Sequence, residues 1–209
     1  MKRLFDALFR KKLPAPKVLS PAEFGAMMRA EAAARPKPPP PPERKEAGVV
    51  AFRTFTHIYS HAVYRMCVPD PTGYDELLAA DLAPEPLGRA AREALAASRF
   101  ITPQHPERDS IMRFPTKEEA AAADQRLKSH AKVRSLKALF DGAGMVSLRL
   151  MDGRIAITPL CYRTRGAWEG FAGNGAIDVG ADVADNELGA AIAKAIAISR
   201  EAKRPPKGP

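Results

Sequence analysis

Cysteine is scarce in this sequence: among 209 residues there are two, Cys67 and Cys161, and neither has metal-type spacing around it. Two thiols cannot form the dense disulfide framework of a small secreted domain, so a reduced, cytoplasmic protein is the simpler interpretation. Long apolar runs are also lacking, because no stretch approaches the roughly 20 residues that cross a bilayer. The basic start of the chain has neither the apolar run nor the cleavage site of a signal peptide.

Recognised catalytic motifs are missing as well. The sequence contains no phosphate loop of the G-x-x-x-x-G-K-[ST] type, no G-x-S-x-G elbow and no H-E-x-x-H helix. The glycine-rich segment 170–175 lacks the strand-to-helix context of a dinucleotide site, and we interpret it as a hairpin loop. We therefore predict a protein that works by binding rather than as an enzyme, with no cofactor and no metal site.

Cys67 lies close in sequence to two histidines, His57 and His61. The histidines fall in a segment of strand-like composition, which would place them about 13 Å apart at 3.3 Å per residue. No cysteine or acidic residue near them completes a metal site, and a buried structural cysteine is the default interpretation of Cys67. The alternative that remains open is a thiol-dependent enzyme using Cys67 with His57 or His61.

The formal charge of +9 resides at the ends of the chain. Residues 1–48 carry 11 Lys and Arg against 5 Asp and Glu, whereas residues 49–200 carry 19 against 18. A nucleic-acid-binding domain usually shows its basic excess on the fold itself, so we expect no nucleic-acid partner. Residues 1–12 place four apolar side chains on one helical face among basic residues, so a second alternative is an adaptor with weak membrane-surface contact.

Composition divides the chain into three parts. Residues 1–48 form a basic tail and polyproline linker, mostly disordered, with one helix opened by the capping box at Ser20. Residues 49–200 form a single α+β domain, and residues 201–209 form a disordered tail. Within the domain we expect two related strand–helix halves, about 49–110 and 132–200, joined by a helix near 116–129 that begins with a second capping box.

Strand composition and hairpin signals fill the two halves. Residues 49–68 favour a hairpin that turns near Ser60 and His61. Asp152-Gly153 is the strongest local hairpin signal. Further strands are predicted at residues 133–140, 145–151, 154–159 and 177–179, and the halves end in helices closing near Arg99 and Arg200.

The helices at the ends of the two halves resemble each other. Residues 78–99 align with residues 179–200 without a gap, and ten of the 22 positions are identical. Five of these pairs are alanines, but Leu87/Leu188 and Gly88/Gly189 are more specific. Because glycine inside a helix costs about 1 kcal/mol relative to alanine, its presence at the same place twice predicts a close helix–sheet approach. These observations favour an internal repeat.

A loop between strands holds Arg163, Arg165 and Trp168, the candidate binding residues. Arginine and tryptophan are enriched at the energetic centres of protein interfaces, and loops on a rigid scaffold commonly supply them. Two alternatives stay open: Trp168 packs in the core, or binding lies on the basic segment that contains Arg126, Lys128, Lys132 and Arg134.

Two stretches carry a resemblance to a known family. The first is the strand–turn–strand segment 145–159, which leads through Gly166-Ala-Trp-Glu-Gly170 to the closing helix with Glu187–Ile192 and Ile198–Arg200. The second is the segment from Leu87-Gly88 to Ser98-Arg99. Together they resemble the immunity proteins of contact-dependent growth inhibition (toxin–immunity) systems. The resemblance implies a cytoplasmic protein that binds and neutralises the toxic C-terminal domain of a cognate effector.

The aligned helices predict that Leu87 and Leu188 anchor the core, because each begins an apolar stripe at i, i+4, i+7 and i+8. Replacing either leucine by Ala should lower the free energy of unfolding by about 2–5 kcal/mol, the usual cost of truncating a buried leucine. Chemical denaturation of the two single variants measures this loss. Unchanged stability in both variants would contradict the stripe and the repeat built on it.

Overall fold

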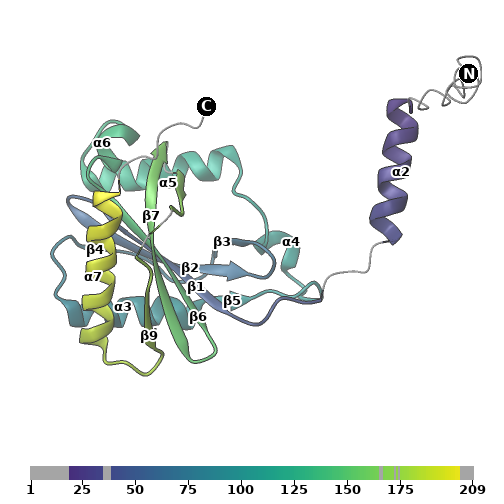
Figure 1. Cartoon of the computed structure of the whole chain (residues 1–209). Coiled ribbons are helices and arrows are strands. Elements are labelled where there is room, and N and C mark those ends of the chain that lie inside the picture. Colours follow the sequence, from purple (N-terminus) through teal and green to yellow (C-terminus); the bar gives the residue numbers. More distant parts are fainter. Residues whose placement is uncertain (1–18, 35–38, 165–166, 172, 174, 203–209) are drawn as a thin grey trace, which may run out of the picture. The chain divides into compact units, whose positions relative to one another are not determined.

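The computed structural model describes residues 19–34, 39–164, 167–171, 173 and 175–202 (Figure 1). The chain divides into two units, Met1–Pro40 and Pro41–Pro209. In the first unit α2 (Pro21–Ala34) begins at the predicted capping box, where Ser20 Oγ accepts from the Glu23 N–H and the Glu23 carboxylate accepts from the Ser20 N–H. The predicted membrane-contact segment 1–12 and residues 203–209 lie outside the described residues.

A largely antiparallel sheet forms the centre of the second unit. Its middle has the strand order β2-β1-β6-β7, with bounds β1 Lys45–Ala51, β2 Phe55–Val63, β6 Gly144–Met151 and β7 Arg154–Thr164. The outer strands each pair with β2 or β7. They are β3 (Cys67–Pro69), β4 (Asp75–Ala79), β5 (Arg99–Phe100), β8 (Ala167–Glu169) and β9 (Ile177–Gly180).

Helices cover both faces of this sheet (Figure 1). One face packs against α3 (Pro84–Ala97) and α7 (Asp185–Glu201) through the main apolar core. The other face packs against α5 (Lys117–Ala131) and α6 (Leu136–Phe140) through a smaller aromatic cluster. A short helix, α4 (Arg108–Ile111), follows β5. The predicted α+β class is confirmed, and Leu87 and Leu188 lie in the main core at 5% and 0% exposure.

The two halves of the sheet follow one plan. Residues 55–59 of β2 pair with β4 and residues 61–63 with β3, just as the start of β7 pairs with β9 and its end with β8. Matching serines tie each helix to its hairpin. Ser98 Oγ accepts from the Glu46 N–H and donates to the His61 carbonyl, while Ser199 Oγ accepts from the Met145 N–H and donates to the Leu160 carbonyl. This common plan is what the internal-repeat hypothesis requires.

The paired glycines, Gly88 and Gly189, allow α3 and α7 to approach each other closely. A Cβ added to Gly88 would lie 1.9 Å from the Asp185 carbonyl oxygen of α7, and one added to Gly189 would lie 1.8 Å from the Pro84 carbonyl oxygen of α3. Each glycine thus meets the first residue of the opposite helix. The close approach predicted from these glycines exists, but its partner is the other helix and not the sheet.

Three local predictions differ from the structure. Residues 133–140 do not form a strand: Ser135 caps α6, and the spacing of Leu139 and Phe140 after Leu136 suits one buried helical face. Ser60 and His61 lie inside β2, where the Ser60 hydroxyl accepts a hydrogen bond from the Tyr74 N–H. β1 begins at Lys45, three residues before the expected end of the linker at residue 48, because Ala47 is already fully buried.

Among the described residues, no helix is both long enough and apolar enough to cross a membrane.

The glycine contact predicts that Gly88→Ala and Gly189→Ala each destabilise the fold. Alanine gains about 1 kcal/mol in helix propensity over glycine. This gain cannot offset the steric clash between the new methyl group and the carbonyl oxygen of the opposite helix. We expect a net loss of about 1–3 kcal/mol or more in the free energy of unfolding.

Gly170→Ala is the matched control, because a Cβ at Gly170 meets nothing within 4 Å. Denaturant titration should place this control within about 0.5 kcal/mol of the native protein. Native-like stability of the Gly88 and Gly189 variants would rule out the close contact.

Candidate functional site

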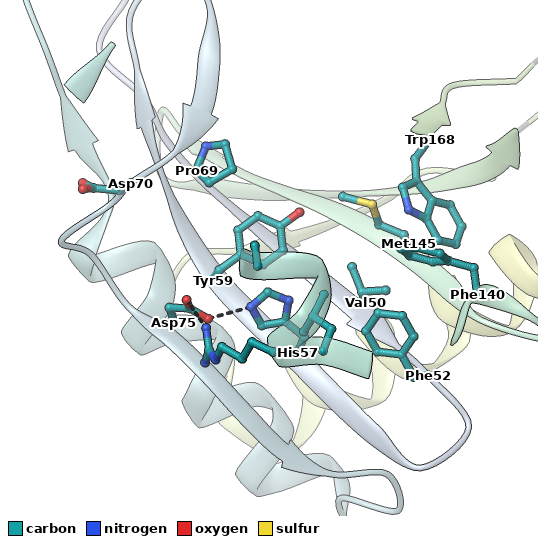
Figure 2. Close-up of a pocket in the computed structure, with 13 residues that line it drawn as sticks. Val50, Phe52, His57, Tyr59, Pro69, Asp70, Asp75, Phe140, Met145 and Trp168 are labelled. Atoms are coloured by element: carbon teal, nitrogen blue, oxygen red, sulfur yellow. Dashed lines mark hydrogen bonds and ion pairs between the residues drawn. The ribbon is translucent and has the colours of Figure 1, made fainter. Parts of the chain in front are cut away.

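A pocket of about 280 Å³ opens on the face of the sheet that carries α5 and α6 (Figure 2). Its floor comes from β1, β2 and β6, and its walls come from α5, α6 and the β7–β8 hairpin. Most of the lining is apolar, which suits recognition of an apolar group with a few polar contacts to orient it. The lining residues are Val50, Phe52, His57, Tyr59, Pro69, Asp70, Asp75, Ala123, Arg126, Leu127, Phe140, Met145 and Trp168.

An aromatic cluster forms one wall of the pocket. Phe140 and Tyr162 are stacked with their ring centroids 5.3 Å apart. Trp168 stands edge-on to both, at 6.2 Å from Phe140 and 5.2 Å from Tyr162. Trp168 is half-buried, because its strand β8 places it directly opposite Tyr162 of β7. The tryptophan therefore belongs both to the smaller core and to the pocket surface.

The opposite wall carries a chain of polar side chains. His57 Nε2 lies 2.6 Å from Asp75 Oδ1, and Arg126 of α5 donates to Asp75 Oδ2 at 2.6 Å (Figure 2). The hydrogen bond with His57, aided by Arg126, holds the pKa of the Asp75 carboxyl down at about 2. Asp75 is therefore ionised at neutral pH and links α5 to β4.

Tyr59 lies beside this chain, stacked on the His57 ring. Burial, reinforced by the negative charge of Asp75, raises the pKa of the Tyr59 hydroxyl far above its ordinary value. The hydroxyl therefore remains protonated and can act as a donor in the pocket.

The three candidate binding residues have different surroundings. Trp168 lines the pocket, as described. Arg163, near the end of β7, forms an ion pair with Glu169 across the β7–β8 hairpin. Arg165 lies outside the described residues. Of the alternative basic residues, Arg126 lines the pocket through its contact with Asp75.

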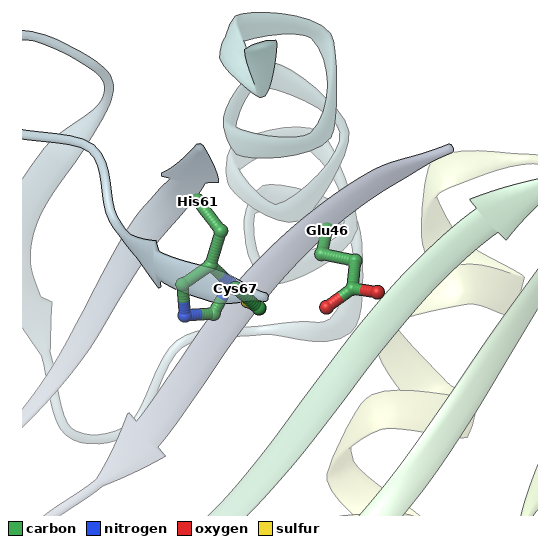
Figure 3. A group of neighbouring side chains, drawn as sticks. All are labelled: Glu46, His61 and Cys67. Carbon is green, nitrogen blue, oxygen red and sulfur yellow. The ribbon is translucent and has the colours of Figure 1, made fainter. Parts of the chain in front are cut away.

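Cys67 lies in a second polar cluster, at the edge of the same face of the sheet (Figure 3). One potential ligand atom from each of Glu46, His61 and Cys67 lies within 4.8 Å of the others. We expected no acidic partner for the histidines, and this prediction was wrong, because Glu46 of β1 lies beside His61. His57 does not take part, since it faces Asp75 in the pocket.

The protonation states in this cluster are set by burial and by two arginines. Burial opposes the charge of Glu46, but hydrogen bonds from Arg44 and Cys67 and the charge of Arg149 hold the pKa of its carboxyl below the usual value. Cys67 as a whole residue is exposed, yet its sulfur lies against this carboxylate. Burial of the sulfur and the Glu46 charge raise the pKa of the thiol. Since the thiol stays protonated at neutral pH, the cluster gives no support to a thiol-dependent enzyme.

Comparison with known protein families identifies the family of the second unit. The profile of the CDI immunity protein family, CdiI, matches residues 45–199. The chain belongs to this family. The match begins at the first residue of β1 and ends within α7, so it spans the sheet, both helical layers and the pocket.

Solved structures share the fold of this CDI immunity protein. One is described as a protein of unknown function, NMB0488, from Neisseria meningitidis. It has 23% sequence identity and a TM-score of 0.65, with 74% of this chain and 94% of that chain covered. Another belongs to the CdiA-CT/CdiI toxin and immunity complex from Yersinia pseudotuberculosis. It has 21% identity and a TM-score of 0.63, with 75% and 97% covered. No curated protein shows significant sequence similarity.

Sequence reasoning missed most of the pocket of this CDI immunity protein. Asp75 lies on a strand that was not predicted, after the expected hairpin of residues 49–68, and Phe140 was in a predicted strand. Neither residue has a neighbour in sequence that signals a pocket. Trp168 was singled out in advance by its residue type, and Arg126 was named only as part of an alternative basic segment. The lining residues come together through tertiary packing of β1, β2, β6, α5 and α6.

The depressed pKa of Asp75 predicts a pH-dependent contribution to stability. A carboxyl whose folded pKa lies below its unfolded value stabilises the fold above the unfolded value and loses that contribution as pH falls through the folded one. Asp75→Asn should therefore lower the free energy of unfolding at pH 7, and the gap to the native protein should close between about pH 4 and pH 2. Denaturant titrations across this range measure the gap. A gap of constant size at every pH would contradict the assignment.

Proposed function

We propose that this CDI immunity protein binds the toxic C-terminal domain of a cognate contact-dependent growth inhibition effector and neutralises it by stoichiometric binding in the cytoplasm. The observation that carries the proposal is the family match over residues 45–199. The similar Yersinia chain, of the same fold, is part of a toxin and immunity complex. Neutralisation of this kind needs a complementary surface and no turnover, which fits a non-enzymatic role.

We propose the aromatic pocket as the centre of the toxin-binding surface. Interface energy is concentrated in a few well-packed positions, and pockets lined by aromatic side chains are typical of them. Trp168, Tyr59 and Phe140 offer large rigid surfaces whose ordering costs little further entropy, because the fold already holds them. An apolar side chain of the toxin is the group that this lining fits best.

The polar wall adds specificity to the same surface. Asp75 is already paired with His57 and Arg126, so a toxin group can be oriented by it without leaving an unpaired charge buried. The Tyr59 hydroxyl supplies a donor. A toxin that cannot form hydrogen bonds to these polar groups would still remove them from water, which weakens its binding. The polar wall therefore discriminates against non-cognate toxins.

The β7–β8 hairpin extends this surface through Arg163 and Arg165, in our proposal. Its link to the pocket is Trp168, which stands between the hairpin and the aromatic wall. Arginines at the edge of an interface mainly affect association rate and partner choice, whereas a buried aromatic anchor affects dissociation. We therefore assign Trp168 to affinity and the arginines to selectivity.

The proposal predicts that filling the pocket abolishes tight binding without harming the fold. Ala123 is exposed on α5 and lines the pocket, so Ala123→Trp adds bulk at its mouth while leaving the core unchanged. We expect the affinity for the cognate toxin domain to fall at least about 30-fold, equivalent to ~2 kcal/mol, with loss of protection in a growth-competition assay. Calorimetric titration of the purified pair gives the affinity.

Ala121→Trp is the matched control, since Ala121 is exposed on the same helix and does not line the pocket. It should bind within about threefold of the native protein if the site is local. Reversing Arg163 and Arg165 to Glu, with Arg89→Glu on α3 as control, tests the hairpin in the same assay. Toxin binding by every folded variant would exclude this face but not the function, whereas failure of the native chain to bind its toxin would exclude the function itself.

A further inference from the structure

Three neighbouring strands each contribute one side chain of a metal-ligand type to a single cluster. Glu46 comes from β1, His61 from β2 and Cys67 from β3, and a ligand atom from each lies within 4.8 Å of the other two (Figure 3). The three strands are adjacent in the sheet, because β2 pairs with both β1 and β3. The cluster lies apart from the His57–Asp75 wall of the pocket.

His61 provides a second and independent observation. His61 is 8% exposed, and its Nδ1 atom has no hydrogen-bond partner among the described residues. Buried polar atoms without a partner are rare in native proteins and need a physical reason. The ring is fixed edge-on to Tyr59 with centroids 5.1 Å apart, and Figure 3 shows it turned towards Cys67. A cation between the three side chains would supply the missing partner.

We propose that Glu46, His61 and Cys67 bind one zinc ion. A thiolate, an imidazole and a carboxylate together are the ligand types that zinc accepts, whereas magnesium and calcium prefer oxygen ligands alone. The three side chains leave one position of a tetrahedron open, which a water can fill. On binding, the bond between sulfur and hydrogen breaks, a zinc–sulfur bond forms and the proton leaves to solvent; no electron is transferred.

The two arginines fix the carboxylate for this role. Arg44 Nε and Arg149 Nε both donate to Glu46 Oε1, at 2.7 and 3.0 Å, so Oε2 is the oxygen that turns to the ion. Partners of this kind orient metal ligands in many sites. Their positive charges oppose the ion: solvent screens Arg149, whose side chain is 54% exposed, whereas Arg44 is only 15% exposed.

Bringing the ligands to bonding distance requires a small movement. Around tetrahedral zinc the ligand atoms lie about 3.3–3.8 Å apart, given bond lengths near 2.0–2.3 Å. From the 4.8 Å limit of the cluster, the ligand atoms have at most roughly 1–1.5 Å to close. β3 has three residues and pairs with β2 alone, so it is the element that can supply this shift. The bound ion would then tie β3 to β1 and β2.

Cobalt(II) is the probe that tests the site in the full chain. Metal-free protein, kept reduced, is titrated with cobalt and then zinc. We expect one cobalt per chain, a thiolate-to-cobalt charge-transfer band in the near ultraviolet, visible bands of a four-coordinate ion, and displacement of all these signals by one equivalent of zinc. Zinc should also raise the thermal midpoint of the native chain, because binding to the folded state alone stabilises it.

Cys67→Ser and His61→Asn should each weaken zinc binding at least about tenfold, the size that even an outer-shell change can produce. Cys67→Ser also abolishes the charge-transfer band and the thermal shift, while Cys161 remains in it as an internal control for unspecific thiol binding. Circular dichroism checks that each variant is folded. Absence of the band in the native chain, or its survival in Cys67→Ser, would overturn the proposal. Toxin binding is not the readout, so the result is independent of the proposed function.

Discussion

The backbone contact between α3 and α7 at Gly88 and Gly189 is the constraint on which the rest of the domain depends. With no Cβ at either position, each helix meets the first carbonyl of the other, and both can lie flat on the same face of the sheet. Arg92 strengthens the crossing by donating to Asp185 and to the carbonyls of Ala181 and Val183. Because this face is closed, the opposite face is left for α5, α6 and the pocket.

The sequence predicted the helices and strands whose apolar residues recur at a regular spacing because they are buried in the main core. The stripes that begin at Leu87 and Leu188 are buried as expected, and the hairpin at Asp152-Gly153 joins β6 to β7. Predictions were wrong where a tertiary partner decides the local structure. Ser60 stays in a strand because Tyr74 satisfies its hydroxyl, and Phe140 is helical because an aromatic cluster receives it.

The candidate site was harder to predict for a related reason. Trp168 could be found by residue type alone, but its importance rests on Phe140 and Tyr162, which the sequence does not connect to it. Glu46 was assigned to the linker, so its meeting with His61 and Cys67 could not be foreseen. Sequence spacing identifies sites built within one element, whereas both clusters here are built across strands.

One wall of the pocket differs from the others in how it is held. α5 has no buried residue and attaches through half-buried Leu127 and the contact of Arg126 with Asp75, whereas the floor belongs to strands that also form the main core. Substitutions on α5 therefore change the shape and charge of the pocket at little cost in stability. When the toxin changes, α5 can change in sequence while the strands and the main core stay the same. New binding specificities can therefore arise without intermediate variants that fail to fold.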